Sequence, residues 1–480
     1  MRKFVFWLML VALILAIAAV PAAATEPGMF LVILNQENVD TQTLDAVQQA
    51  GGEVTGRLDQ IGVIAVSTSN ASAFLDAVQR VPGVMSVAPD MTWEVSPDWA
   101  GAEVTGTSTS PENPADPAAY TWGVQRVTAN GAAWAIHEGT HDVVVAVVDS
   151  GIDLTHPDLA GNIVPGSRSF IPGAGPQDQF GHGTHLAGII AANGRIKGVA
   201  PGVGLRAYRV FNAQGKSTDS SILQGIVAAA EDGVDVINLS LGGKSLMGQS
   251  FRIDPVTGKR TPNGNGVDHW VAQRRAIQYA VRHNATVVAA VGNDSLDLTN
   301  RNAVTQWWNG VLASQGQPVV WEGATFISPA ETPGALAVSG LGGGWGTADR
   351  LAFYSNYGTG VVSITAPGGD RGPIGNQDPD AHKYRILSTV PPAVMCSAIT
   401  RSLFGTCGYH FSMGTSQAAP HVAGAAALVI SEAYARTGVK PSPAQVVATL
   451  LQTADDVGKV GYDEFYGHGM VNAYRALVGK

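Results

Sequence analysis

A serine, a histidine and an aspartate stand in short glycine-rich segments of this sequence, a setting that suits nucleophilic catalysis. Ser416 opens a run of small residues, His182 lies between two glycines, and Asp149 ends an apolar run. A serine hydroxyl is a weak nucleophile at neutral pH, so it needs a neighbouring base, and an imidazole base needs a third group that fixes its tautomer. The three residues therefore predict acyl transfer through Ser416, with His182 as the base and Asp149 orienting it.

Each of these residues also has a structural interpretation when it is taken alone. An aspartate that closes a strand is commonly a turn former or a helix cap, and a single histidine among glycines is commonly structural. The chemical interpretation therefore depends on all three residues occurring together.

The strand and helix signals predict a fold that would bring these residues together. Short β-branched runs at 142–148, 234–239 and 285–291 alternate with glycine-containing turns and helical patterns. Such runs predict an α/β fold, a mainly parallel sheet flanked by helices on both faces. Functional groups in sheets of this kind gather at the carboxyl ends of the strands, which is where Asp149 stands.

The segments around the three residues resemble the catalytic signatures of the subtilisin-like serine proteases, the subtilases. They read Asp149-Ser150-Gly151-Ile152-Asp153, Gly181-His182-Gly183-Thr184-His185 and Gly414-Thr415-Ser416, in the Asp, His, Ser order of that family. Further similar segments occur at 156–159, 198–201, 354–358, 366–368 and 466–473. The resemblance implies a serine endopeptidase domain at 120–480, with the subtilisin-like fold and no cofactor required for the chemistry.

The resemblance also assigns an oxyanion donor. Val291-Gly292-Asn293 is similar to the family segment whose asparagine donates to the developing oxyanion. The Asn293 side chain and the backbone N–H of Ser416 would supply the two preorganised donors that such a charge needs. The alternative for Asn293 is a loop-capping residue.

Two further segments resemble the edges that bind the substrate backbone. Ser240, Leu241 and Gly242 begin a segment similar to the family strand that pairs with the substrate, and the segment from Gly215 to Asp219 resembles the opposing edge. An extended peptide between two such edges adds main-chain hydrogen bonds, which predicts protein or peptide substrates. The charges of Lys216 and Asp219 either bias the upstream subsites or are simply solvated.

The composition excludes several classes of protein. The chain has 480 residues, 45% of them apolar and 14% charged, with 58 glycines, which indicates a compact and turn-rich protein rather than a disordered one. The formal charge of -9 argues against a nucleic-acid partner. That acidity is concentrated, because residues 25–119 hold two basic and thirteen acidic residues, whereas 120–480 hold 25 of each.

The acidic segment has the pattern of a small domain of its own. Strand signals at 30–34, 61–66 and 84–87 alternate with two helical patterns. In pattern and position this α/β module, residues 25–95, resembles the family's inhibitory propeptide, which would be an intramolecular partner of the protease. Residues 96–119 are rich in Pro, Gly, Ser and Thr and predict a linker. We expect maturation between about residues 95 and 119.

The first 24 residues predict a secretory signal peptide. Arg2 and Lys3 precede the apolar run 4–20, and Ala22-Ala23-Ala24 supplies small residues for cleavage. The alternative, an uncleaved membrane anchor, is disfavoured because the run lies at the lower edge of the length that spans a bilayer. We therefore expect a secreted, extracellular protein that is soluble, monomeric and without a stable membrane anchor.

The sequence predicts one disulfide and does not define a metal site. In an exported chain, Cys396 and Cys407 predict a disulfide rather than two free thiols. Asp158 matches a calcium ligand of bacterial subtilisins, but the segment 193–197 is shorter than their calcium-binding loop. Structural calcium is therefore expected only from the family, and no metal site is assigned. His185 and His421 are interpreted as structural.

Two other function classes compete with this assignment. A different serine hydrolase, such as a lipase, would need an aspartate and a histidine after the nucleophile, for which only Asp463 and His468 are convenient, and Ala418 breaks the Gly-x-Ser-x-Gly elbow. An inactive relative serving as a binding protein is disfavoured because every catalytic group is present. The insertions 244–267 and 294–324 flank the cleft motifs. They either extend subsites or shield a surface, and the tryptophans of the second favour aromatic packing over both.

Overall fold

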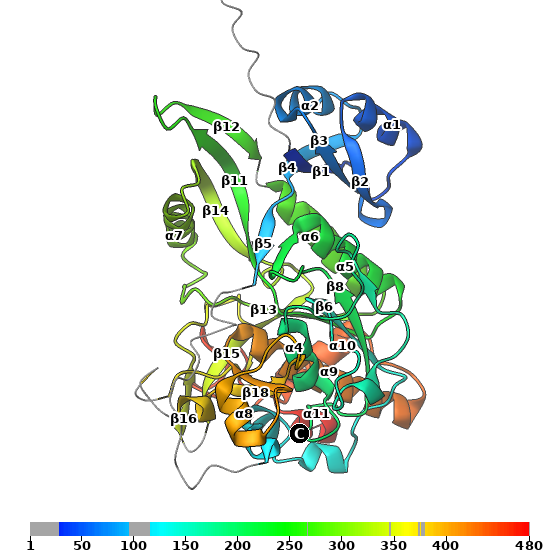
Figure 1. Ribbon diagram of the computed structural model, residues 1–480, viewed down its shortest axis with the longest axis vertical. Coiled ribbons are helices and arrows are strands. Elements are labelled where there is room, and N and C mark those ends of the chain that lie inside the picture. The colour runs from blue at the N-terminus through cyan, green and yellow to red at the C-terminus, as the bar shows by residue number, and fades with distance from the viewer. Residues whose placement is uncertain are drawn as a thin grey trace, which may run out of the picture.

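The computed structural model describes residues 28–95, 116–265, 267–344, 347–372, 375 and 380–479. The predicted signal peptide and residues 96–115 of the predicted linker lie outside these ranges. Within them, a small N-terminal unit lies against a larger α/β body (Figure 1).

The larger body is built on a mainly parallel sheet, which confirms the predicted fold class. The sheet has the order β16-β15-β13-β10-β6-β8-β7 with β17 beside β15, and its pairs are parallel except β15 with β16. Its strands are β6 (Val144–Asp149), β7 (Arg168–Ser169), β8 (Gly204–Arg209), β10 (Val236–Leu239), β13 (Thr286–Ala290), β15 (Ala335–Gly344), β16 (Thr347–Leu351) and β17 (Ile364–Pro367).

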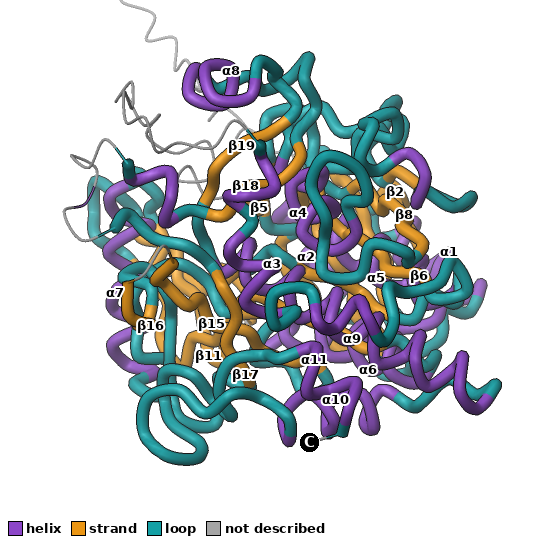
Figure 2. Tube along the Cα trace, turned by 90° about the horizontal axis from the view of Figure 1, so that it is seen from below, coloured by secondary structure: helices purple, strands orange, loops and turns teal. Residues whose placement is uncertain are grey.

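Helices cover both faces of this sheet, as the buried side chains of β6 show. Val145 and Val147 pack in one apolar cluster with residues of α4 and α9, whereas Ala146 and Val148 pack in a second cluster with residues of α5 and α6. Figure 2 shows the strands enclosed by helices. The helices of the body are α3 (Trp122–Val127), α4 (His182–Ala191), α5 (Asp219–Glu231), α6 (Val267–Arg282), α7 (Arg301–Ser314), α8 (Ala398–Phe404), α9 (Thr415–Thr437), α10 (Pro443–Gln452) and α11 (Ala473–Val478).

The N-terminal unit is a four-stranded antiparallel sheet of order β2-β3-β1-β4 that carries two helices. Its elements are β1 (Gly28–Leu34), α1 (Thr41–Gln49), β2 (Glu53–Leu58), β3 (Val63–Thr68), α2 (Ala71–Val78) and β4 (Val84–Pro89). The sequence pattern missed β2 because its residues alternate between exposed and half-buried without an apolar run. The strand expected at 61–66 begins at Val63, because Gly62 has a φ of +61° and ends a turn.

The N-terminal unit docks on α5 and α6 (Figure 1). The guanidinium of Arg275 donates to the backbone carbonyls of Leu34 and Ile61, at 2.9 and 3.1 Å. Arg282 pairs with Glu37 at 2.9 Å. Basic residues of the body therefore meet the acidic unit directly.

The two insertions form one structure. The first contains most of β11 (Gly243–Ile253) and β12 (Arg260–Asn265), and the second contains α7 and the start of β14 (Val319–Ser328). β14 pairs with β11 over its whole length, so the two insertions share a three-stranded sheet that rises beside the N-terminal unit (Figure 1). Trp308 packs against Trp307 and Trp321, with ring centroids 6.1 and 5.8 Å apart, which confirms the expected aromatic packing.

Candidate active site

Strand β6 and helix α4 bring Asp149 and His182 together. Asp149 ends β6 with no exposed surface, and its Oδ1 lies 2.8 Å from Nδ1 of His182. The backbone N–H of Ser150 donates to the same oxygen at 2.7 Å. Because the carboxylate faces Nδ1, it holds the proton there and leaves Nε2 as the basic nitrogen.

The glycine after His182 lets α4 begin at this place. A Cβ on Gly183 would collide with the carbonyl oxygen of Gly151, in the turn that follows β6. The N–H of Gly183 donates to the hydroxyl of Ser150 at 2.8 Å. The close approach of these two glycine segments therefore sets the position of the imidazole against the carboxylate.

Ser416 lies in the first turn of α9, beside the end of β10. Its hydroxyl donates to the carbonyl of Ser240 at 3.1 Å, and the Ser240 hydroxyl donates to the carbonyl of Ser416 at 2.8 Å. Ser416 is half-buried, whereas its neighbours Thr415 and Gln417 are 1% exposed. The hydroxyl of Ser416 is thus accessible and held against the predicted substrate strand.

Asn293 is oriented by the residue that precedes the serine. The backbone N–H and the hydroxyl of Thr415 both donate to Oδ1 of Asn293, at 2.9 and 2.8 Å. A Cβ built on Gly414 would lie 3.4 Å from Nδ2 of Asn293 and 3.6 Å from the backbone nitrogen of Ser416. The two nitrogens therefore border one small space beside Gly414, which the Oε1 of Gln417 also borders at 2.9 Å from that Cβ position.

Asn356 fixes the loop that carries Asn293. It is fully buried, its Oδ1 accepts from the N–H groups of Asp294 and Leu296 at 3.1 and 3.0 Å, and its Nδ2 donates to the carbonyl of Val291 at 2.9 Å. The resemblance to the family marked the segment 354–358 but gave Asn356 no role. Its position makes it a positioning residue for Asn293.

The end of the N-terminal unit occupies the predicted substrate edge. Strand β5 (Thr92–Glu94) pairs antiparallel with β9 (Lys216–Thr218), and the N–H of Val95 donates to the carbonyl of Gly215 at 2.9 Å. The ring of Trp93 lies on Gly243, where a Cβ would come within 2.7 Å of it. The segment therefore runs between the two edges that were predicted to bind substrate.

Comparison with known proteins shows the family. Residues 140–469 match the Subtilase family, Peptidase_S8. The chain belongs to the subtilases. It is 30% identical over 362 residues to the thermophilic serine proteinase of Bacillus sp. (strain AK1), an alignment that covers 75% of this chain and 67% of that protein. It is 33% identical over 340 residues to the subtilisin of Bacillus pumilus, covering 70% of this chain and 90% of the relative.

A solved structure agrees with this assignment at the level of the fold. The crystal structure of a mutant of EpiP, the epidermin leader peptide processing serine protease from Staphylococcus aureus, matches with a TM-score of 0.72 at 23% identity, over 94% of this chain and 99% of that one. Together with the family match, the related proteinases identify this subtilase as a serine endopeptidase.

The surroundings of Asp158 in this subtilase do not fit a calcium ion. Its Oδ1 accepts from the N–H of Arg195 at 3.0 Å, and its Oδ2 accepts from the N–H of Ile196 at 3.1 Å and from the Tyr409 hydroxyl at 2.8 Å. Calcium needs six to eight oxygen ligands, whereas hydrogen-bond donors surround this carboxylate. In the described ranges, no group of three or more His, Cys, Asp or Glu side chains could hold a metal ion.

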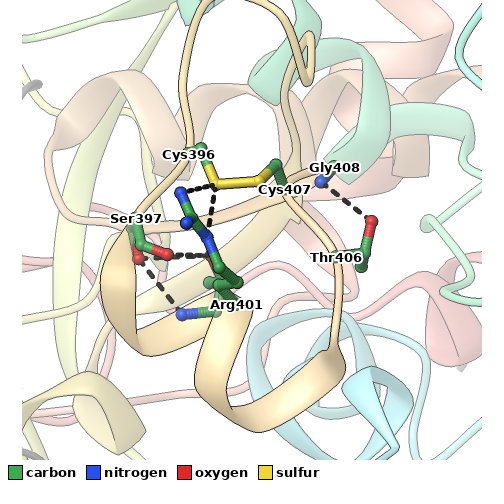
Figure 3. Close-up of a disulfide and its surroundings, with 7 residues drawn as sticks. Cys396, Ser397, Arg401, Thr406, Cys407 and Gly408 are labelled. Atoms are coloured by element: carbon green, nitrogen blue, oxygen red, sulfur yellow. Dashed lines mark hydrogen bonds between the residues drawn. A yellow bond between two sulfur atoms is a disulfide. The ribbon is translucent and has the colours of Figure 1, made fainter.

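The predicted disulfide is present and lies before the serine segment. Cys396 and Cys407 are bonded across a loop that contains α8, and Arg401 donates to the sulfur of Cys396 at 3.1 Å (Figure 3). The loop joins β18 (Ile386–Thr389) to β19 (Tyr409–Ser412), which leads to Gly414. The bond therefore closes the hairpin that delivers Ser416.

His185, His421 and Asp463 make hydrogen bonds with the backbone of the protein. The ring of His185 contacts the carbonyl of His410 at 3.1 Å, and that of His421 contacts the carbonyl of Gln417 at 2.8 Å. Burial holds the pKa of His185 well below its usual range and lowers the pKa of His421 to about 4, so both rings are neutral at pH 7. Asp463 accepts the N–H groups of residues 465 and 466 in a turn, which leaves the lipase-like alternative without support.

Proposed function

We propose that Asp149, His182 and Ser416 are the catalytic triad of this endopeptidase and that Asn293 is its oxyanion donor. The buried hydrogen bond between Asp149 and His182 carries the proposal, because it fixes the tautomer that a general base requires. In the proposed reaction, the Ser416 hydroxyl leaves the carbonyl of Ser240 and donates instead to Nε2 of His182. Its oxygen then attacks the scissile carbonyl while His182 takes the proton.

The tetrahedral intermediate places its oxyanion in the space beside Gly414. There the Nδ2 of Asn293 and the backbone N–H of Ser416 donate to it. His182 returns the proton to the leaving amine, an acyl group remains on Ser416, and water resolves it by the same route. The substrate backbone lies between Gly215 and the segment Ser240, Leu241 and Gly242, which connects β10 to β11. The pairing of β5 with β9 supports this extended binding mode.

We further propose that the chain is a secreted, monomeric zymogen with residues 25–95 as its propeptide. The occupied substrate edge supports autoinhibition, and the charge contrast across the interface supports the partnership, with Arg282 on Glu37 as one pair. Maturation would cut between about residues 95 and 119 and release a segment whose net charge is -7 if the cut follows residue 95 and -11 if it follows residue 119. None of the described helices has the length and apolar character needed to cross a membrane.

The variant Ser416→Ala tests the proposal, with Ser402→Ala, an exposed serine on α8, as the matched control. We expect Ser416→Ala to accumulate precursor that retains residues 25–95 and to lose hydrolysis of casein, while the control matures and cleaves normally. N-terminal sequencing of the secreted products locates the cut. Normal processing and activity of Ser416→Ala would overturn the assignment.

A further inference from the structure

An ion pair joins the two insertions at their first residues. Lys244 begins the insertion 244–267, and Asp294 begins the insertion 294–324. The Nζ of Lys244 donates to Oδ1 of Asp294 at 3.2 Å, and the two side chains are 15% and 16% exposed. Because water is largely excluded from this pair, salt screens it less than an ion pair on the open surface. The contact therefore fixes the starts of two segments that lie 50 residues apart in the sequence.

The carboxylate of Asp294 is also fastened to the loop that carries Asn293. Its Oδ2 accepts from Nδ2 of Asn356 at 3.1 Å. Gly292 lies beside both groups, since a Cβ there would come within 2.7 Å of this nitrogen and 3.3 Å of Oδ2 of Asp294. Residues 291–296, which we call the oxyanion loop, are thus packed closely around one buried amide. The ion pair with the insertion acts directly on this loop.

Both insertions also hold Lys244 in place. It is the second residue of β11 and pairs with Ile327 of β14, the strand against which α7 lies (Figure 1). Its Nζ lies 5.0 and 5.4 Å from the ring centroids of Trp307 and Trp308 on α7. An ammonium over an aromatic face is attracted by the ring, and more strongly where water is excluded. The tryptophans therefore do more than pack against each other, because they restrict where the ammonium lies.

The ion pair links the two segments that border the nucleophile. Lys244 lies four residues after Ser240, which exchanges two hydrogen bonds with Ser416. Asp294 directly follows Asn293. Catalytic groups have to be held to within about 0.5 Å, and a misplacement of about 1 Å costs roughly 100-fold in rate. A contact that connects the segment beside the nucleophile to the oxyanion loop is therefore in a position to affect the reaction.

We propose that Lys244 is a positioning residue for Asn293, and that the two insertions support the oxyanion loop through the ion pair of Lys244 with Asp294. The inference rests on the proposed function, because it requires Asn293 to be the oxyanion donor. Lys244 acts through Asp294 and not on the reacting atoms. It holds the oxyanion loop so that Nδ2 of Asn293 is at hydrogen-bond distance from the oxyanion. Displacement of that nitrogen weakens binding of the transition state more than binding of the substrate, so the effect belongs in kcat rather than in KM.

The first test is a double-mutant cycle of Lys244→Met with Asn293→Ala. Methionine keeps an unbranched side chain and removes the ammonium. Immobilised wild-type enzyme matures the full-length precursors, and kcat for a fluorogenic peptide is expressed per active site, counted by stoichiometric labelling of Ser416 with a fluorophosphonate. Lys244→Met should lower kcat about 5- to 50-fold and change KM less than about twofold. In the Asn293→Ala background, the same substitution should change kcat less than about twofold.

The cycle separates a positioning role from a general effect on the fold. An equal loss of kcat in both backgrounds, a change in KM alone, or no change in either constant would overturn the inference. If Asn293→Ala itself leaves kcat unchanged, the oxyanion role under the proposed function fails, and the inference fails with it. Lys259→Met, the same substitution at an exposed lysine of the first insertion, is the matched control and should keep the wild-type kcat.

The second test examines the charge and its aromatic support. Lys244→Arg keeps a cation that donates to Asp294 and should retain kcat within about threefold of wild type. Trp307→Leu with Trp308→Leu should lower kcat about two- to fivefold when Lys244 is present and have no effect in Lys244→Met, because the rings act through the ammonium. A loss in Lys244→Arg as large as in Lys244→Met, or a tryptophan effect that does not depend on residue 244, would overturn the role of the ion pair.

Discussion

Replacement of Asp158 tests whether hydrogen bonds, rather than a metal ion, hold the loop 193–197. In Asp158→Ala, the N–H groups of Arg195 and Ile196 and the hydroxyl of Tyr409 lose their common acceptor. A buried donor without a partner costs about 1–3 kcal/mol, so three of them, one only partly buried, should lower the free energy of unfolding by roughly 3–6 kcal/mol. Tyr409→Phe removes a single bond to the carboxylate and should cost about 1.5–3 kcal/mol.

The measurement is urea unfolding in the Ser416→Ala background, which prevents self-digestion, with and without EDTA. The double variant Asp158→Ala/Tyr409→Phe should lose about 1–3 kcal/mol less than Asp158→Ala alone, because the orphaned hydroxyl has been removed. EDTA should leave the difference in unfolding free energy between the parent and the Asp158→Ala variant unchanged. The reasoning is refuted if EDTA destabilises the parent as much as Asp158→Ala does and has no effect on that variant, since the carboxylate would then bind a metal.

Three further predictions concern the site and its support. Asn293→Ala should lower kcat about 100- to 1,000-fold, the range known for the loss of one such donor in subtilisin. KM should change much less. A loss of kcat below about fivefold in steady-state assays would contradict the oxyanion role. Because burial lowers the pKa of His421 to about 4 against about 6.5 in the unfolded chain, the unfolded state binds the proton first, and stability should fall by about 3 kcal/mol as the pH drops from 6.5 to 4. His421→Gln should flatten the dependence of the unfolding free energy on pH between 6.5 and 4. An unchanged slope in this variant would count against the role of His421. Cys396→Ser with Cys407→Ser should lower the free energy of unfolding by up to about 3 kcal/mol; equal denaturation curves for the oxidised parent and this variant would show that the bond contributes nothing.

The sequence was sufficient for those features that are local. The segments around Asp149, His182 and Ser416 are short and have the residue types of the family, and β6 and β10 are continuous apolar runs, so the family and these strands could be predicted directly. Strand β2 could not be predicted from the sequence, because it is held by its pairing with β3 and has no apolar run of its own.

Long-range partners were beyond the sequence pattern. The hydroxyl that donates to Asp158 comes from Tyr409, 251 residues away. The sequence left open whether Asp219 is solvated, because its partner Trp93 is 126 residues earlier. In each case the deciding contact joins two segments that neither periodicity nor spacing relates to each other.

The docking of Arg275 has a consequence for how the proposed propeptide can diverge in sequence. Its guanidinium contacts the backbone carbonyls of Leu34 and Ile61, and a carbonyl is present whatever side chain the residue carries. This contact therefore depends on the backbone conformation of the N-terminal unit and not on its side chains. Propeptides of unlike sequence but equal topology should be interchangeable at this contact, which leaves Trp93 and Glu37 as positions where mutational drift is constrained.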